Sequence, residues 1–154
     1  MTTSDAKLEL ISPFEAQNYW EQCFPLIAEI LDTMGLRCKM DETHVWAWVL
    51  QGRMHLWLAV DDSTNEVVAF SLTEPLNYPK CWILDHFMSS VNPKYRHKVD
   101  LEEMYLVQEN WAKSQGFSGI QAHGRYGWKK FLKEHGYEAP TITSIKNFTD
   151  ERFH

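Results

Sequence analysis

The segment YRHKVDLEEM, residues 95–104, places three basic side chains just before the expected start of a helix. Arg96, His97 and Lys98 precede Asp100, a residue type that is favoured at the N-cap of a helix. A helix N-terminus offers free backbone N–H groups and the positive end of the helix dipole, and both favour a bound phosphate. Loops that hold a phosphate closely use glycine, and this segment has none. Two interpretations therefore stay open, an anion site that works through charge and a solvated basic loop.

Other patterns that carry chemistry are missing from the sequence. The seven histidines show neither His-x-x-x-His nor His-x-His spacing, so no metal site is predicted. There is no Gly-x-Ser-x-Gly motif that would indicate a serine nucleophile. Three cysteines, Cys23, Cys38 and Cys81, are odd in number and far apart, which indicates reduced thiols.

The composition favours one soluble domain over residues 1–154. A chain of 154 residues with 44% hydrophobic side chains is long enough to bury a sizeable core. Its formal net charge of -6 disfavours nonspecific nucleic-acid binding, which depends on clustered Lys and Arg. The first residues lack a signal-peptide pattern, and no apolar run is long enough to cross a bilayer. We therefore expect a cytoplasmic protein without a membrane segment.

Apolar periodicity predicts a mixed α/β domain with the element order β, α, α, β, β, β, α, β, α, β. Helices are expected over residues 13–35, 41–52, 100–116 and 125–136. Strands are expected over residues 7–12, 55–60, 66–72, 81–91, 119–123 and 139–148. The segment 73–80 contains two prolines and is predicted to be a connector.

This order, together with residues 91–137, resembles the GNAT superfamily of N-acetyltransferases. The segment VNPKYRHKVDLEEMYLVQENWAKSQGF is similar to the acetyl-CoA segment of that family, and FLKEHGY at 131–137 is similar to its late helix. Matching positions are Val91, Pro93, Tyr95, Arg96, Lys98, Trp111, Ala112 and Gly116. The resemblance implies a single GNAT-like domain, with a central splayed mixed sheet flanked by helices. The GRYGW stretch also resembles small GNAT-like proteins of bacteriophages.

The chain departs from the family in the loop that would hold the cofactor pyrophosphate. The resemblance assigns this loop to Arg96, His97, Lys98, Val99 and Leu101, with Val99 and Leu101 at the two places where the family has small residues. Their side chains would crowd a pyrophosphate, and Asp100 would repel it by on the order of 1 kcal/mol.

The late helix departs as well. The family tyrosine that can protonate the departing thiolate would stand at Leu132, and Tyr126 lies near that position in the sequence. Trp128 stands where the family often has a small residue, so an inward-pointing indole would narrow the cofactor slot.

Glu74, Asp85 and His86 are the candidate catalytic residues. The resemblance places them at or near the strands that flank an amine substrate, where each could act as general base if its pKa lay near neutrality. The alternative for each is a hydrogen-bonded or edge-facing structural residue, which is common for a polar side chain in an apolar strand.

Three functions follow from this interpretation. The first is a bacteriophage-encoded accessory protein that requires no cofactor and binds a protein, either in virion assembly or in the host cell. Exposed members of the group Trp46, Trp48, Trp57 and Trp82 would form its binding surface. The second is an acetyl-CoA-dependent N-acetyltransferase that acts on a primary amine. The third, a nucleic-acid binder that stacks bases on aromatic side chains, is disfavoured by the net charge.

Overall fold

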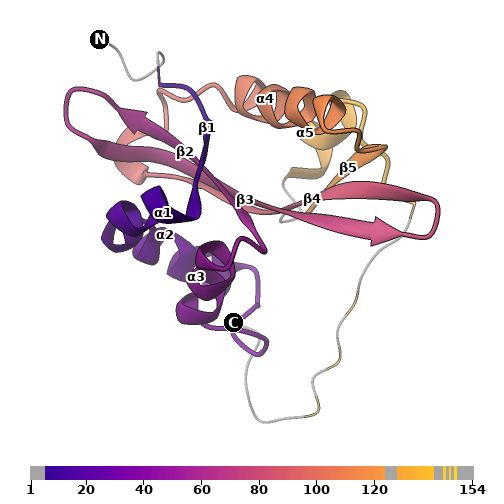
Figure 1. The fold of residues 1–154 in the computed structure, drawn as a ribbon, viewed down its shortest axis with the longest axis horizontal. Coiled ribbons are helices and arrows are strands. Elements are labelled where there is room, and N and C mark those ends of the chain that lie inside the picture. Colours follow the sequence, from indigo (N-terminus) through magenta and orange to yellow (C-terminus); the bar gives the residue numbers. More distant parts are fainter. Residues whose placement is uncertain (1–5, 124–127, 141–143, 145, 147, 149–154) are drawn as a thin grey trace.

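Five strands form one sheet through the middle of the molecule (Figure 1). The structure is a computed structural model and describes residues 6–123, 128–140, 144, 146 and 148. Strand order follows the sequence; the first four strands are antiparallel, and the fifth runs parallel to the fourth. The strands are β1 (Glu9–Ile11), β2 (His55–Asp61), β3 (Glu66–Tyr78), β4 (Cys81–Val91) and β5 (Gly119–Ala122).

Helices cover both faces of this sheet (Figure 1). A parallel neighbour needs a crossover connection, and α4 (Leu101–Ser114) provides it between β4 and β5. We call the side covered by α4 and α5 (Lys129–Glu134) the α4 face. The opposite side, the α2 face, carries α1 (Pro13–Ala16), α2 (Trp20–Thr33) and α3 (Glu42–Leu50). The described residues also include the 3-10 turns η2 (Gln17–Tyr19) and η3 (Pro93–Tyr95).

Alternating side chains on β2 divide the interior into two apolar clusters. Leu56 and Leu58 pack toward α2 and α3, whereas Trp57 and Ala59 pack toward α4. Both faces of the strand are apolar because helices cover both. The one polar group of the buried Trp57, its indole N–H, donates to Thr73 Oγ1 at 3.0 Å, so its burial leaves no unpaired donor.

The single helix predicted over residues 13–35 is wrong. α1 ends at Ala16, and the chain leaves helical geometry at Tyr19, whose φ is -118° and ψ is 5°. The break lets residues on both sides of it pack on the core that includes α3: Ala16 is fully buried there, and Trp20 places its ring 4.8 Å from that of Trp46. The predicted end at Gly35 is confirmed, since that glycine has a φ of 66°.

The connector predicted over residues 73–80 is also wrong, because β3 continues through it to Tyr78. Pro75 pairs with Leu84 of β4 inside this extension. Pairing between β2 and β3 starts at His55 and Thr73, so among the described residues β3 beyond Thr73 pairs with β4 alone. A proline is tolerated there because its missing N–H can lie on the unpaired side.

The remaining described elements confirm the predicted order. β4 has the predicted bounds, and α4 begins after its predicted N-cap, Asp100, whose carboxylate accepts from Glu103 N at 3.1 Å. The predicted helix stops at Gly116 and Gly136 have φ values of 84° and 86°. Half of the residues of the strand predicted over 139–148 lie outside the described part of the chain, as does the beginning of the helix predicted from residue 125.

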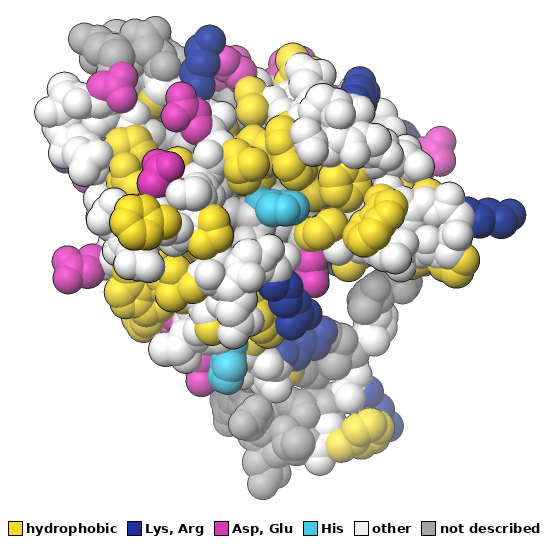
Figure 2. Space-filling view, in the orientation of Figure 1, with side chains coloured by type: hydrophobic (Ala, Val, Ile, Leu, Met, Phe, Trp, Pro, Cys, Tyr) yellow, Lys and Arg dark blue, Asp and Glu magenta, His cyan; other side chains and the backbone are white. Residues whose placement is uncertain are grey.

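The surface carries hydrophobic side chains over the sheet and the neighbouring α1 helix (Figure 2). Of the tryptophans expected to form a partner surface, Trp46 and Trp57 are buried in the two cores, so they are not available for it. Trp82 is about half exposed. In the described part of the chain, no helix is long and apolar enough to span a bilayer.

Replacing Asp100 tests the cap of α4. Asp100→Ala should lower the free energy of unfolding by about 1 kcal/mol, because the N–H of Glu103 loses its acceptor. Asp100→Asn should stay within a few tenths of a kcal/mol of the unmutated protein, since asparagine caps about as well. Asp62→Ala, in an exposed turn, is the control. Urea denaturation measures all three, and an unchanged midpoint for Asp100→Ala would contradict the cap.

Candidate functional site

β4 changes its pairing on both sides at nearly the same residue. Against β3, His86 pairs with Thr73 and Met88 pairs with Leu72, so Phe87 is an extra residue in the ladder. On the other side, pairing with β5 ends at His86 and Ala122. From Phe87 to Val91, β4 therefore runs with a partner strand on one side only among the described residues.

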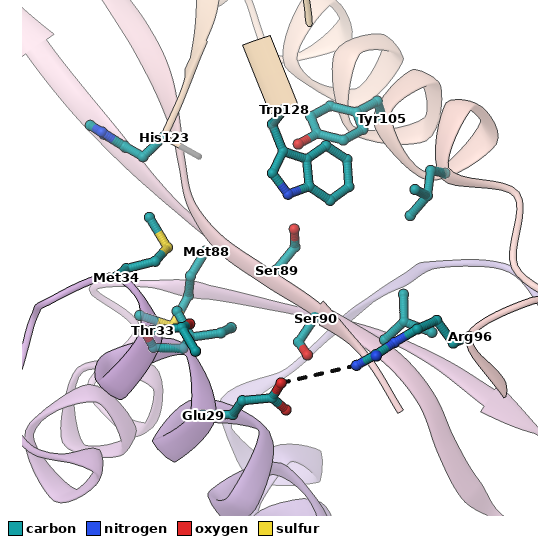
Figure 3. Close-up of a pocket in the computed structure, with 13 residues that line it drawn as sticks. Glu29, Thr33, Met34, Met88, Ser89, Ser90, Arg96, Tyr105, His123 and Trp128 are labelled. Carbon is teal, nitrogen blue, oxygen red and sulfur yellow. Dashed lines mark hydrogen bonds and ion pairs between the residues drawn. The ribbon is translucent and has the colours of Figure 1, made fainter. Parts of the chain in front are cut away.

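A cleft of about 390 Å³ opens where the two strands part (Figure 3). Its floor is residues 88–91 of β4, whose unpaired backbone edge can offer N–H and C=O groups to an extended ligand. α2 forms one wall, and α4 with the segments at His123 and Trp128 forms the other. The lining side chains outside β4 are Glu29, Ile30, Thr33, Met34, Arg96, Leu101, Tyr105, His123 and Trp128.

The indole of Trp128 points into this cleft, which is the inward orientation considered from the sequence. Figure 3 shows its ring between Tyr105 and Ser89, and its centroid lies 6.5 Å from that of Tyr105. The side chain at this position thus narrows the space beside β4. Tyr126, the other aromatic residue considered near this position, lies outside the described residues.

Arg96 reaches across the cleft mouth toward Glu29 of α2 (Figure 3). Its Nη2 lies 4.0 Å from Glu29 Oε1, and both side chains are about half exposed. An ion pair of this length in water contributes little stability and is screened by salt. The guanidinium is therefore available to exchange this carboxylate for another anion.

The other predicted cofactor-loop residues separate into two kinds. His97 and Lys98 are exposed on the loop before α4. Val99 is partly buried against the apolar cluster of the α4 face, whereas Leu101 packs there and also lines the cleft. The bulk expected to crowd a pyrophosphate thus comes to the cleft from Leu101, and Val99 is turned toward the core.

Asp85 and His123 form the strongest polar pair at the cleft. Asp85 is 5% exposed, and its Oδ1 lies 2.7 Å from His123 Nε2 and accepts from Gln121 Nε2 at 2.9 Å. The Asp85 carboxylate raises the pKa of His123 above its usual value, partly offset by burial. About half of the His123 side chain is exposed, so it meets solvent and cleft together.

His123 is a site residue that the sequence did not indicate. Gln121 is the partner of Asp85 in the parallel β4 and β5 ladder, and a residue two positions later lies on the same face. The histidine that follows GIQA is therefore aligned with Asp85 by strand register. Only the pairing of β5 with β4 reveals this relation, since the two residues are 38 positions apart.

Glu74, Asp85 and His86 do not come together as one site. Glu74 and Asp85 are ladder partners, and the Glu74 carboxylate lies 3.3 Å from Arg53 Nε, which gives it a structural partner. His86 follows Asp85 in the strand and so points to the opposite face. The structure therefore brings Asp85 to His123 and separates it from His86.

His86 is buried beneath α4 and is 3% exposed. Its Nδ1 lies 2.7 Å from Gln108 Oε1, and Gln108 Nε2 donates to Ser71 Oγ at 2.7 Å. Because an amide oxygen only accepts, Nδ1 carries the proton and Nε2 has a lone pair. Burial lowers the pKa of His86 to about 4, so the ring is neutral at pH 7 and is a poor base.

Metal chemistry has no counterpart in the described residues, where no three His, Cys, Asp or Glu side chains gather as a possible metal site.

Comparison with known proteins identifies the fold. The sequence matches no protein-family model and no curated protein. Among solved structures, the ribosomal-protein-alanine N-acetyltransferase from Brucella melitensis biovar Abortus 2308 superposes with a TM-score of 0.69 at 14% identity, covering 92% of this chain and 99% of that one. A putative acetyl transferase from Pyrococcus furiosus gives 0.67 at 13%, with 92% and 100% covered.

An aminoglycoside acetyltransferase from an uncultured soil metagenomic sample is similar too, with a TM-score of 0.64, 10% identity, and 94% and 96% of the chains covered. At these identities the likeness is one of fold. The chain has the α/β fold of GNAT acetyltransferases, a five-stranded mixed sheet flanked by helices, as the resemblance in sequence predicted.

Because His86 is buried in its neutral form, the free energy of unfolding should depend on pH. The unfolded chain takes up a proton on this residue near pH 6.5, whereas the native state resists until about pH 4. Its contribution is present above pH 6.5 and is lost as the pH falls, by up to roughly 1.4 kcal/mol per pH unit. Denaturation of the unmutated protein and of His86→Phe between pH 4 and 7 measures this slope. Equal slopes for the two proteins would show that His86 is not buried in neutral form.

Proposed function

We propose that the protein is an acyl-CoA-dependent N-acyltransferase that acts on a primary amine. The observation that carries this proposal is the cleft between β4 and the residues beyond β5, with the Asp85–His123 pair at the point where the strands part. The cleft has an unpaired strand edge for an extended ligand, and the pair is a group that can take a proton. Acyl transfer to an amine needs the amine and the acyl donor to be aligned and a base, or water, to take the proton.

The cleft residues fit an acyl-CoA in part. The open edge of β4 at residues 88–91 would hold the amide-containing arm by main-chain hydrogen bonds, as an added strand does. Arg96, His97 and Lys98 would hold its phosphates by charge, beside the N-terminus of α4. Bound acyl-CoA would supply a thioester, whose carbonyl carbon is the electrophile. Trp128 limits how much of the arm the cleft admits.

His123 is the proton acceptor in this proposal. With Nε2–H donated to Asp85, its Nδ1 has a lone pair that can take a proton from the amine. The amine nitrogen then bonds to the carbonyl carbon as the C–S bond breaks. Asp85 orients the ring and stabilises its protonated form. Since Leu132 has no proton to give, the departing thiolate would take one from water or from His123.

A second candidate is the accessory protein that binds another protein without a cofactor. Two observations favour it. The Asp100 carboxylate already occupies the N-terminus of α4, and the indole of Trp128 occupies part of the cleft. Exposed Phe14, Phe24 and Leu50 on α1, α2 and α3 would contribute to a protein-binding surface. Virion assembly or a host protein as its target, a bacteriophage origin and a cytoplasmic location stay predictions.

Acetyl-CoA should protect the protein from thermal unfolding. At a hundred times its dissociation constant a ligand adds about 2.7 kcal/mol, which raises the melting temperature by about 5 to 10 °C for a domain of this size. Arg96→Ala should reduce this rise, and Lys80→Ala, an exposed cation in the β3–β4 turn, should not. Asp100→Asn keeps the cap but removes the charge, so it should tighten binding by about fivefold.

Trp128→Ala completes that comparison by enlarging the cleft. Protection that appears only in Trp128→Ala would indicate that the indole excludes the ligand in the natural chain. The absence of any shift in all these variants would reject acyl-CoA binding and leave the accessory protein as the proposal.

The rate of acyl transfer should depend on His123. Because only the neutral ring accepts a proton, the rate should rise as the pH passes the pKa of His123, which lies above 6.5. His123→Gln should lose this rising limb and about 10²- to 10⁴-fold of the rate, with little change in acetyl-CoA affinity. Chromatographic detection of acetylated product from a panel of amines measures it, with His135→Gln as the control. A pH profile that persists in His123→Gln would assign the base to another group.

A further inference from the structure

A second, smaller cavity lies behind the cleft on the α4 face of β4. It has a volume of about 50 Å³. Ser89, Ser90, Val91, Leu101, Tyr105 and Trp128 line both spaces, so the smaller one is a side chamber of the larger. Judged by the cavity volume that one water molecule needs, the chamber has room for about three or four non-hydrogen atoms.

The chamber wall is mostly apolar, but two groups of polar side chains contribute to it. Leu8 and Met104 contribute to its walls, and the ring of Tyr105 stacks on His86 at 4.8 Å. Ser89 and Ser90 lie on the side that the chamber shares with the cleft. The second polar group is the chain formed by His86, Gln108 and Ser71, which line the chamber but not the cleft.

Hydrogen bonding fixes what this polar group can offer. Gln108 donates to Ser71 and accepts from His86 Nδ1, so Gln108 holds the imidazole with its lone pair on Nε2. Nε2 is buried and has no hydrogen-bond partner in the described residues. A buried acceptor without a partner is costly, and a ligand that brings a donor removes that cost. A ligand group that donates a hydrogen bond to His86 Nε2 would therefore bind favourably in the chamber.

Charge narrows the class of donor. A carboxylate would face the lone pair of Nε2 and would be repelled. An ammonium group would be buried without a counter-ion, because the walls carry no carboxylate. A hydroxyl on a short carbon chain fits the apolar part of the wall and can donate to the lone pair of His86 Nε2.

The geometry points to a specificity pocket for a short hydroxyacyl group, in which His86 Nε2 accepts a hydrogen bond from the hydroxyl. This inference rests on the proposed function, since the cleft must hold the CoA part of the same molecule. It assigns to His86 the selection of the acyl group, and it leaves proton transfer to His123. Tyr105 and Trp128, at the boundary of the two spaces, would set the depth to which a chain enters.

The test compares binding of three ligands by isothermal titration calorimetry: 3-hydroxybutyryl-CoA, butyryl-CoA with the same carbon chain, and free CoA. The hydroxylated ligand should bind about 3- to 10-fold more tightly than butyryl-CoA, the gain of one hydrogen bond. His86→Phe keeps a ring against Tyr105 but cannot accept, so the preference should vanish or reverse. His135→Phe, away from the chamber, should keep it.

A second measurement does not depend on how well His86→Phe folds. In protein labelled with ¹⁵N-histidine, the Nε2 resonance of His86 should shift on addition of 3-hydroxybutyryl-CoA and stay in place with butyryl-CoA. The double variant His86→Phe with Gln108→Leu removes both polar partners together, which limits the loss of stability.

The outcomes separate the two proposals. If free CoA binds but the two acyl-CoAs bind equally and leave Nε2 unmoved, the chamber does not recognise the hydroxyl, and the hydroxyacyl inference is overturned while the proposed function stands. If none of the three ligands binds, the proposed function fails and the inference fails with it.

Discussion

The molecule is organised by the pairing of β4, which, within the described part of the chain, has a neighbouring strand on both sides as far as His86 and on one side beyond it. Backbone polar groups in a sheet need partners, so a strand that loses its neighbour must turn its edge to water or to a ligand. Here α2 and α4 stand on either side of that edge and keep it in a cleft. The helices and the crossover thus place an unpaired strand edge in the middle of the fold.

The same strand gives two neighbouring titratable residues opposite surroundings. Asp85 lies on the α2 face beside His123, and its carboxylate raises the pKa of that histidine. His86 lies on the α4 face among apolar side chains, and burial lowers its pKa to about 4. Asp85, which orients the proposed proton acceptor His123, and His86, which burial keeps neutral, are therefore adjacent in the chain. Environments that push pKa values apart in this way allow one site to contain groups with different tasks.

Sequence periodicity predicted the elements whose signals are local. The bounds of β4, the Asp100 cap and the ends at Gly116 and Gly136 depend on a few neighbouring residues, and all were predicted. The extension of β3 through Pro75 was not, because it depends on where β2 begins to pair. The break at Tyr19 was missed for a similar reason, since α3 decides which residues before Trp20 are buried.

The candidate site was less predictable than the fold. Asp85 was named, but its partner His123 depends on register between parallel strands that are distant in sequence. His86 was named as a base, and only its burial by α4 shows that it is a poor one. Val99 was expected to crowd a bound pyrophosphate, but its side chain packs against the apolar cluster of the α4 face, which the sequence alone does not show.

The extra residue at Phe87 also determines how β4 responds to substitutions and to deletions. Phe87 and Met88 both pack against the α2-side core, so the alternation of side chains is reset between His86 and Met88. For each residue from Met88 to Val91, the face of the sheet on which its side chain lies depends on how many residues precede it in the strand. Substitutions along β4 change one contact each. Loss of Phe87 would remove only the bulge, because Met88 would still pair with Leu72, whereas loss of Met88, Ser89 or Ser90 would turn the following residues of the cleft floor to the opposite face. The shape of the cleft floor therefore depends more on the length of this strand than on any one of its side chains.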